Sequence, residues 1–291
     1  MSANLFGFLN VYKPKDMTSH DVVAVLRRVT KVKQIGHTGT LDPFAQGVLP
    51  ICIGKATRLI EYLDDEKEYL AEISFGRSTD TYDLDGQAVS ESDLKLTLED
   101  VLEGLKSFEV EISQVPPIYS ALKVKGKKLY EYAREGKEVV IEARKVTIEK
   151  IELKNFDAES QKADVLIKCS KGTYIRSIAH DLGQNLKTGA YLSKLIRTQA
   201  GKFFVDKTIP LDEVTTFDIV EKNLINPIDM LNLPQVELND VEYKKIMMGQ
   251  FIENKNNLKE NDFLILIYDK SISAIAMIND NQIKVKKVFS A

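Results

Sequence analysis

Apolar residues recur at helical spacing in three parts of the chain. Thr18 and Asp21 have the spacing of a capping box, which satisfies the free backbone groups at a helix start. Thr97 and Asp100 repeat that spacing, and a third helix is predicted to end near Gly189. The apolar positions that predict these helices are Val22, Val25, Leu26 and Val29, then Val101, Leu102, Leu105 and Phe108, and finally Ile178, Leu182 and Leu186.

Strand-like patterns lie between these helices. Residues 69–76, 145–156 and 162–171 are rich in apolar residues, and Val165, Ile167 and Cys169 alternate with other residues. Strands and helices do not alternate strictly, so the order favours an α+β or mixed-sheet architecture over a doubly wound one.

The pattern breaks at residues 226–234, where two prolines occur in nine residues. We therefore divide the chain into domains 1–232 and 233–291. The second piece is predicted to hold one helix, over residues 240–248, and three strands. Because it is small for an independent core, it is either a small β-barrel-like module or a tail docked on the main domain.

Length and composition describe a globular protein. The chain has 291 residues, of which 44% are hydrophobic, enough for a sizeable core. No apolar run approaches the roughly 20 residues that span a bilayer, and the first residues lack the pattern of a signal peptide. Cys52 and Cys169 lie in apolar runs and are expected to be buried thiols. We expect a cytoplasmic protein with no membrane contact.

The net charge of −3 argues weakly against a nucleic-acid partner, but basic residues cluster locally. One cluster comprises Arg27, Arg28, Lys31 and Lys33. The second is the segment 123–150, in which nine lysines and arginines stand against five glutamates. By composition alone, a solvated surface is the favoured explanation of both clusters.

Residues 36–50 read GHTGTLDPFAQGVLP and place one carboxylate, Asp42, in a loop rich in glycine, threonine and proline. Functional loops of this kind often carry catalytic groups. The same residues also fit a helix start, because aspartate caps free N–H groups and proline suits the first helical position. Spacing alone leaves catalysis and capping open.

The sequence contains only incomplete matches to phosphate-binding and metal-binding motifs. Lys55 follows Gly54 as in a phosphate-binding loop, but Ala56 stands where a serine or threonine is needed. A calcium-like run at residues 81–92 lacks its first and last chelating carboxylates. The three histidines have no metal-like spacing, so we predict no metal site.

Residues 36–50 resemble the central motif of the TruB family of pseudouridine synthases. Further segments resemble the same family in collinear order as far as about residue 200. They are the opening block 10–28, in which Asp16 replaces the usual glycine, and the segments 67–69, 78–83, 116–136 and 169–183. The last residues, 233–291, resemble the PUA-like RNA-binding module more weakly.

The resemblance implies a fold and an activity. The fold is a mixed, mainly antiparallel sheet of pseudouridine synthase type, with an RNA-gripping insertion at about 116–145 and a small β-rich module. The activity is isomerisation of the uridine at position 55 in the TΨC loop of tRNA. It implies base flipping, no cofactor and no obligate protein partner.

It also implies roles for single residues. Asp42 is the nucleophile, Arg176 its ion-pair partner, and Asp83 a second partner of Arg176; an arginine at a helix start independently suggests a nearby carboxylate. Tyr69 stacks on the base, Leu195 packs against it, and His37 lies near the flipped nucleotide. Backbone contacts are assigned to Arg27, Arg28, Lys31, Lys123, Lys125, Lys127 and Lys128.

Several alternatives remain at this stage. One is a non-catalytic RNA binder or tRNA-folding factor, which retention of Asp42, Tyr69 and Arg176 disfavours. Another is a synthase of the same fold that acts on a different RNA with a partner complex, and a hydrolase is more distant. The residues are compatible with attack of Asp42 on the base, attack on the sugar, or removal of a proton.

Overall fold

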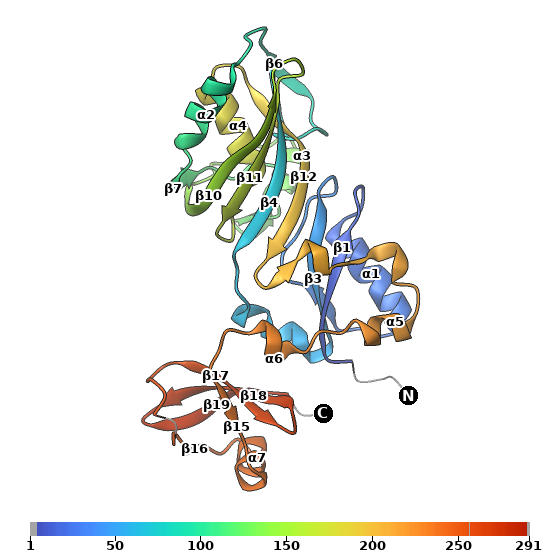
Figure 1. The fold of residues 1–291 in the computed structure, drawn as a ribbon, viewed down its shortest axis with the longest axis vertical. Helices are drawn as coiled ribbons and strands as arrows, with labels where there is room; N and C mark the ends of the chain where they lie inside the picture. The colour runs from blue at the N-terminus through green and yellow to red at the C-terminus, as the bar shows by residue number, and fades with distance from the viewer. Residues whose placement is uncertain (1–4, 256, 290–291) are drawn as a thin grey trace.

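The computed structural model describes residues 5–255 and 257–289. In these residues the largest sheet has ten strands, in the order β14-β1-β3-β12-β4-β11-β10-β7, with β13 paired to β12 and β2 to β3 (Figure 1). Only the β1–β14 and β3–β12 pairs are parallel. The predicted α+β class with a mainly antiparallel sheet is therefore confirmed. The strands are β1 (Gly7–Lys13), β2 (Ile35–His37), β3 (Gln46–Ile53), β4 (Lys67–Phe75), β7 (Val110–Gln114), β10 (Arg144–Asp157), β11 (Lys162–Cys169), β12 (Ala190–Ala200), β13 (Phe203–Phe204) and β14 (Ile209–Pro210).

Helices cover this large sheet at two places. Both predicted capping boxes are present, at Thr18 and at Thr97, so the first two helices begin where the sequence placed them. In Figure 1, α2 and α4 lie beside β10 and β11, whereas α1 and α5 lie beside β1. The helices are α1 (Ser19–Thr30), α2 (Leu98–Lys106), α3 (Leu129–Arg134), α4 (Ile175–Asn185), α5 (Phe217–Lys222), α6 (Pro227–Met230) and α7 (Asp240–Met247), with 3-10 segments η1 (Gly54–Tyr62), η2 (Val205–Lys207) and η3 (Leu211–Glu213).

Two small sheets lie outside the large one. β5 (Arg77–Thr79) pairs with β6 (Ala88–Glu91). β8 (Lys123–Val124) pairs with β9 (Lys127–Lys128) and forms the hairpin of the segment that resembles an RNA-gripping insertion.

The last part of the described chain forms a five-stranded sheet, and the three strands predicted there are present. Its order is β15-β17-β18-β19-β16, and it has a hydrophobic cluster of its own that includes Leu264 and Ile283. The strands are β15 (Gln235–Glu237), β16 (Ile252–Glu253), β17 (Phe263–Tyr268), β18 (Ser271–Asn279) and β19 (Gln282–Val288).

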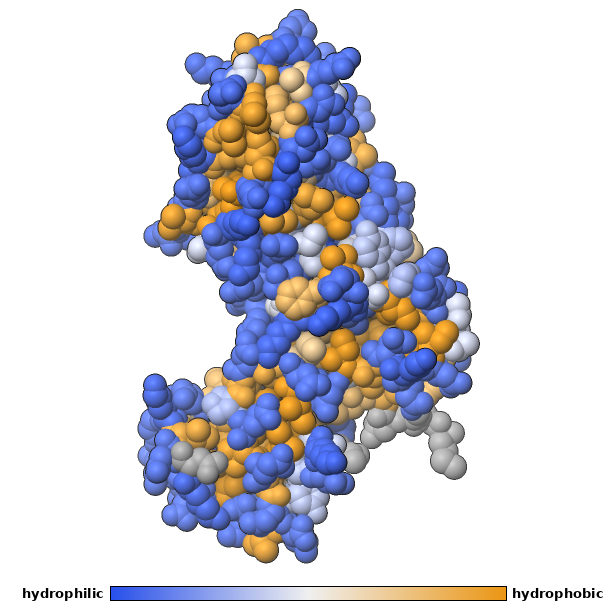
Figure 2. Space-filling view, viewed as in Figure 1, coloured by the Kyte–Doolittle hydropathy of each residue, from blue (hydrophilic) through white to orange (hydrophobic). Residues whose placement is uncertain are grey.

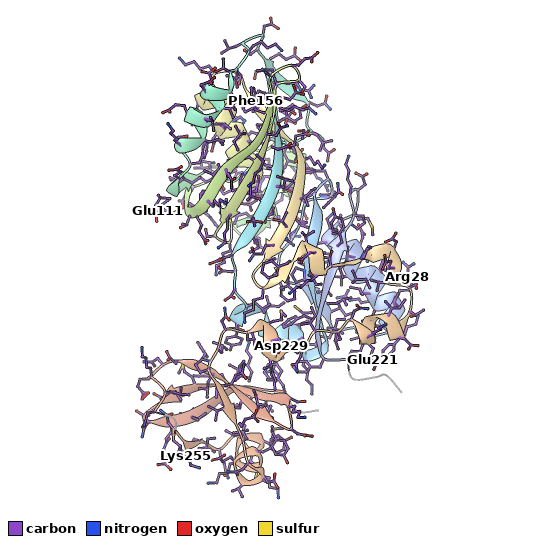
Figure 3. All side chains as sticks on the ribbon, viewed as in Figure 1. Arg28, Glu111, Phe156, Glu221, Asp229 and Lys255 are labelled. Atoms are coloured by element: carbon purple, nitrogen blue, oxygen red, sulfur yellow. The ribbon has the colours of Figure 1, made fainter. Side chains whose placement is uncertain are left out.

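This C-terminal sheet also packs on the rest of the molecule. A second hydrophobic cluster joins Phe8 and Leu59 of the first part to Ile265, Ile275 and Phe289. A polar contact also joins the two parts, since the Arg58 side chain donates to the Val288 carbonyl. Figure 2 shows hydrophobic residues gathered along this junction, and Figure 3 places Asp229 of α6 there. The segment is thus both a module with its own core and a docked one.

Candidate active site

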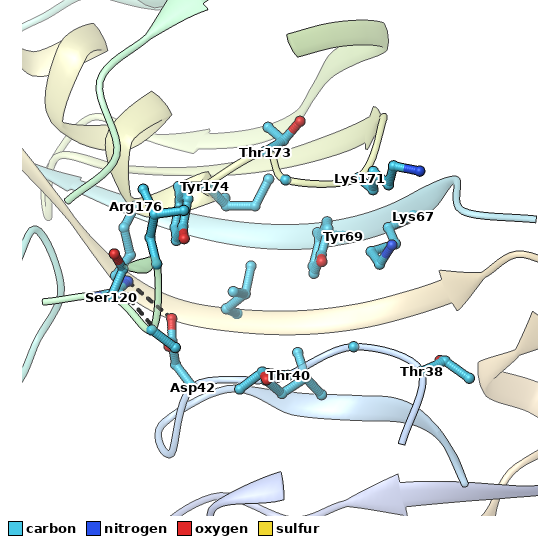
Figure 4. Close-up of a pocket in the computed structure, with 17 residues that line it drawn as sticks. Thr38, Thr40, Asp42, Lys67, Tyr69, Ser120, Lys171, Thr173, Tyr174 and Arg176 are labelled. Atoms are coloured by element: carbon cyan, nitrogen blue, oxygen red, sulfur yellow. Dashed lines mark hydrogen bonds and ion pairs between the residues drawn. The ribbon is translucent and has the colours of Figure 1, made fainter. Parts of the chain in front are cut away.

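A cavity of about 450 Å³ opens beside β4 and β12 (Figure 4). Five segments that are far apart in sequence line it, and each supplies polar groups or a flat apolar surface. The lining residues are Thr38 to Asp42, Lys67 and Tyr69 of β4, Ser120 to Leu122, Lys171 to Arg176, and Leu195 of β12.

Asp42 lies in a turn and not at a helix start. The Ala45 N–H donates to the Asp42 carbonyl at 3.1 Å, and β3 begins directly afterwards at Gln46. The capping interpretation of this loop is therefore wrong, and the Asp42 carboxylate is available for contacts across the cavity.

A buried lysine supports this turn from below. Lys13 is fully buried, and its Nζ donates to the carbonyl oxygens of Pro43 at 3.1 Å, Met17 at 2.6 Å and Pro14 at 2.8 Å. Burial lowers the pKa of Lys13 to about 8. The amine fixes the backbone next to Asp42, a role that the sequence pattern did not reveal.

Arg176, the second residue of α4, joins the two carboxylates. Its Nε lies 2.9 Å from Oδ2 of Asp42, and its Nη2 donates to Oδ1 of Asp42 at 3.2 Å. Its Nη1 lies 3.2 Å from Oδ2 of Asp83, and the guanidinium also donates to the carbonyls of Thr81 and Tyr119. The carboxylate partner expected from the position of Arg176 at a helix start is present. Figure 4 shows the contact between Arg176 and Asp42 at one end of the cavity.

Asp83 is a buried carboxylate, only 5% exposed. Burial raises its pKa above the ordinary value, and the Thr81 hydroxyl and Arg176 offset only part of that effect. Arg176 therefore carries one positive charge between two acidic side chains, which fixes its planar group in one orientation.

Tyr69 and Leu195 form the apolar wall of the cavity. Both are buried, and burial raises the pKa of Tyr69 although Arg197 donates a hydrogen bond to its hydroxyl. A wall that combines an aromatic ring with an aliphatic side chain is suited to bind a planar heterocycle.

Arg197 is the residue that sequence reasoning missed most clearly. It is 1% exposed, and its guanidinium donates to the carbonyls of Val48 at 2.6 Å, Gly39 at 3.1 Å and Thr40 at 3.5 Å as well as to Tyr69. Gly47 is needed beneath it, since φ is +102° there and a Cβ would lie 2.3 Å from the Arg197 carbonyl oxygen. Arg197 thus connects the loop before Asp42 to Tyr69.

His37 lies close to this loop but does not line the cavity. Burial lowers its pKa, its Nδ1 has no hydrogen-bond partner among the described residues, and its ring packs edge-on against His20 at 6.0 Å. The structure therefore brings together Asp42, Tyr69, Asp83, Arg176 and Leu195, while His37 stays at the edge.

The basic residues assigned to RNA contacts lie outside the cavity. Arg28 and Lys31 are exposed on and just after α1, as Figure 3 shows for Arg28, and Arg27 donates to the Ile35 carbonyl. In the β8–β9 hairpin, Lys123 and Lys125 are exposed, Lys127 pairs with Glu135, and Lys128 donates to the Tyr130 hydroxyl.

In residues 5–255 and 257–289, no group of three or more histidine, cysteine, aspartate or glutamate side chains is placed to hold a metal ion. In the same residues, no helix is long and apolar enough to cross a membrane. Cys52 and Cys169 are buried free thiols, as predicted.

The chain is similar in sequence to proteins of a known family. A model of the N-terminal domain of TruB family pseudouridylate synthases matches residues 27–175. The chain is 44% identical to tRNA pseudouridine synthase B of Caldanaerobacter subterraneus subsp. tengcongensis, over 97% of this chain and 99% of that protein. It is 43% identical to tRNA pseudouridine synthase B of Carboxydothermus hydrogenoformans, over 97% and 98%.

Solved structures support the fold. A Cbf5-Nop10-Gar1 complex contains a chain that matches with a TM-score of 0.74 and 25% identity, over 98% of this chain and 85% of that one. A Nop10-Cbf5 complex matches with a TM-score of 0.72 and 22% identity, over 99% and 87%. Fold and comparisons together define the class of the protein, which is a pseudouridine synthase, an isomerase. Within that class the chain belongs to the TruB family.

Proposed function

We propose that this chain converts the uridine at position 55 in the TΨC loop of tRNA into pseudouridine, with Asp42 as the nucleophile. The observation that carries the proposal is the Asp42 carboxylate at the cavity, held by two nitrogens of Arg176. The names of the relatives, tRNA pseudouridine synthase B, support tRNA as the substrate class.

The reaction breaks the bond between C1′ of the ribose and N1 of uracil and forms a bond between C1′ and C5. The proton on C5 is lost and N1 gains one, so the product is an isomer and needs no oxidant or reductant. A carboxylate serves as a covalent nucleophile in such a sequence, because it splits one difficult step into two easier ones. The detached uracil must stay in the cavity while it turns.

The remaining side chains have roles that fit their positions. Tyr69 stacks on the base and Leu195 packs against it, and Arg176 orients Asp42 while Asp83 orients Arg176. His37, at the edge, contacts the nucleotide on its way into the cavity.

The target uridine must leave its stack to reach Asp42, as in other enzymes that act on a base. We assign the phosphate contacts to Arg27, Arg28 and Lys31 and to the β8–β9 hairpin, whose lysines release counterions on binding. We keep the division at residues 232 and 233, with the C-terminal sheet as a PUA-like RNA-binding module. The proposed function requires no cofactor and no obligate protein partner.

The proposal is tested by tritium release from C5-labelled uridine in unmodified tRNA transcripts, without added cofactor. Release from the wild-type transcript, and none from a transcript with cytidine at position 55, is the expected result. Release that persists with that cytidine transcript assigns the activity to another uridine.

Asp42→Asn is predicted to abolish turnover but not binding. The amide keeps the size of the side chain but is a poor nucleophile, so turnover is expected to fall at least about a thousandfold. Affinity for tRNA, measured by filter binding, is expected to stay within about threefold, since the phosphate contacts lie elsewhere. Near-parental pseudouridine formation by this variant refutes the nucleophile assignment.

A further inference from the structure

The hydroxyl of Ser120 is a polar group without a partner inside the cavity. Ser120 is 5% exposed and lines the cavity, yet its Oγ makes no hydrogen bond with any described residue. Thr173, another lining residue, instead donates its hydroxyl to the Ser170 carbonyl. Buried hydroxyls are normally paired, so an unpaired one at a site calls for a functional explanation.

The backbone around Ser120 is held by other groups. Arg176 Nη2 donates to the Tyr119 carbonyl at 3.0 Å, and the Tyr130 N–H of α3 donates to the Ser120 carbonyl at 3.1 Å. Ser177 Oγ fixes the start of the same segment, at the Val115 carbonyl, at 2.9 Å. The Ser120 hydroxyl is therefore not needed to hold the segment in place, although its position is closely fixed.

The surroundings of this hydroxyl limit what it can bind. Figure 4 shows Ser120 beside Arg176 and Asp42, at the end of the cavity opposite Lys67. Arg176 and Asp42 are already paired with each other, which leaves the Ser120 hydroxyl as a neutral polar group next to them. A hydroxyl both donates and accepts, so it matches the edge of a neutral heterocycle that carries carbonyl oxygens and N–H groups.

We propose that Ser120 Oγ donates a hydrogen bond to a carbonyl oxygen of the target uracil. This inference rests on the function proposed above and adds a specificity residue to it. Ser120 lies near the start of the RNA-gripping insertion at about 116–145. The segment that is proposed to hold the RNA backbone therefore also contacts the base. It restrains the base at one edge while Tyr69 stacks on the ring and Leu195 packs against it.

The test combines a protein change with single-atom changes in the substrate. Ser120→Ala is compared with the parental enzyme on tRNA carrying uridine, 2-thiouridine or 4-thiouridine at position 55. Pseudouridine formation is followed by nucleoside chromatography in single turnovers at saturating enzyme. Sulfur accepts hydrogen bonds weakly, so one thio substitution slows the parental enzyme about tenfold and has little further effect on Ser120→Ala. On uridine, Ser120→Ala is itself about tenfold slower.

Ser177→Ala is the matched control. It removes a buried hydroxyl from the same region, but one that is paired with a backbone carbonyl and does not line the cavity. This variant is expected to keep the parental sensitivity to sulfur, and Ser120→Thr, which retains a hydroxyl, to recover most of the rate. If Ser120→Ala does not fold, the isosteric Ser120→Cys takes its place in the comparison.

Three results overturn the inference. They are an unchanged rate of Ser120→Ala on uridine, equal sulfur effects in Ser120→Ala and the parental enzyme, and a parental enzyme insensitive to both thio substitutions. A parental enzyme that forms no pseudouridine in tRNA refutes the proposed function as well, which distinguishes that failure from the other three.

Discussion

The two buried arginines of this site differ in how their charges are compensated. Arg176 faces two carboxylates, whereas Arg197, equally buried, has only carbonyl oxygens and the Tyr69 hydroxyl as acceptors among the described residues. A buried guanidinium without a carboxylate places positive potential beside Tyr69. The two arginines thus have different roles: Arg176 orients the Asp42 carboxylate, and Arg197 holds the Tyr69 side chain.

Arg197→Lys is predicted to reduce turnover about a hundredfold, because a single amine cannot replace a fork that holds both the Gly39–Thr40 backbone and Tyr69. The unfolding free energy is expected to fall by about 2–4 kcal/mol, since buried carbonyls lose their donors. Urea denaturation and single-turnover assays measure the two effects. Arg77→Lys, at a guanidinium that stacks on Tyr191, is the control. Parental turnover in Arg197→Lys contradicts the positioning role.

Asp181 is predicted to make stability depend on pH. Burial raises its pKa from 3.8 to about 6, and no cation pairs with it among the described residues. Between about pH 4 and pH 6 the folded state binds a proton that the unfolded state has lost, so stability falls as pH rises through this window.

Asp181→Asn is therefore expected to stabilise the fold at about pH 7.5 and to have little effect near pH 4. Because the side chain is partly exposed, the gain is about 1 kcal/mol. Urea denaturation at both pH values measures it. An equal effect at the two values rules out the carboxyl as its source.

At the scale of elements, helices and strands with a local sequence pattern were predicted well. Strands that are defined by long-range pairing were predicted poorly. The capping boxes of α1 and α2 and the strands β17, β18 and β19 follow from patterns within a few residues. β3 and β12 have no such pattern, because β3 is buried along nearly its whole length and the two strands pair in parallel through distant parts of the chain.

The same reason explains which site residues were found. Asp42, Tyr69 and Arg176 were identified through a family resemblance, and spacing alone left Asp42 between catalysis and helix capping. Lys13 and Arg197 escaped because a cation in a strand normally reaches solvent. Only the three-dimensional arrangement shows that backbone carbonyls surround both of them.

The β8–β9 hairpin gives a prediction at this scale. Lys123 and Lys125 are exposed and pair with no acidic side chain among the described residues, whereas Lys127 is held by Glu135. Changing Lys123 and Lys125 to glutamine is expected to reduce the slope of log affinity against log salt by about 1–2, roughly one per phosphate contact.

Changing Lys106 and Lys145 to glutamine is the control with the same loss of charge. These exposed lysines pair with Glu103 and Glu111. Filter binding to tRNA at several salt concentrations compares the two double variants. Equal slopes in both would mean that the hairpin lysines face solvent and not phosphate.

For the whole molecule, the docking of the C-terminal sheet determines how it unfolds. Phe289 is 5% exposed, stacks on Phe6 at 5.7 Å and lies under the Arg58 guanidinium. Removing residues after 233 would expose the cluster around Phe8 and Leu59, so such a truncation tests folding before it tests RNA binding.

Calorimetry of the full chain is predicted to show one unfolding transition, because the shared cluster couples the two sheets. Phe289→Ala is expected to destabilise this transition by about 3 kcal/mol. Val241→Ala, at a side chain that is 64% exposed, is expected to change little. Two separated transitions in the parental protein would show that the C-terminal sheet unfolds on its own.

The contact between Asp42 and Arg176 spans 134 residues of sequence, and Arg197 reaches Gly39 across 158. Protein synthesis adds about 5–20 residues per second, so Asp42 is made on the order of ten seconds before its partner. During that time the carboxylate has no guanidinium beside it, and Tyr69 has no arginine behind it. Under the function proposed above, a nascent chain on the ribosome is therefore expected to be inactive until β12 has been synthesised, even if its basic segments already bind RNA.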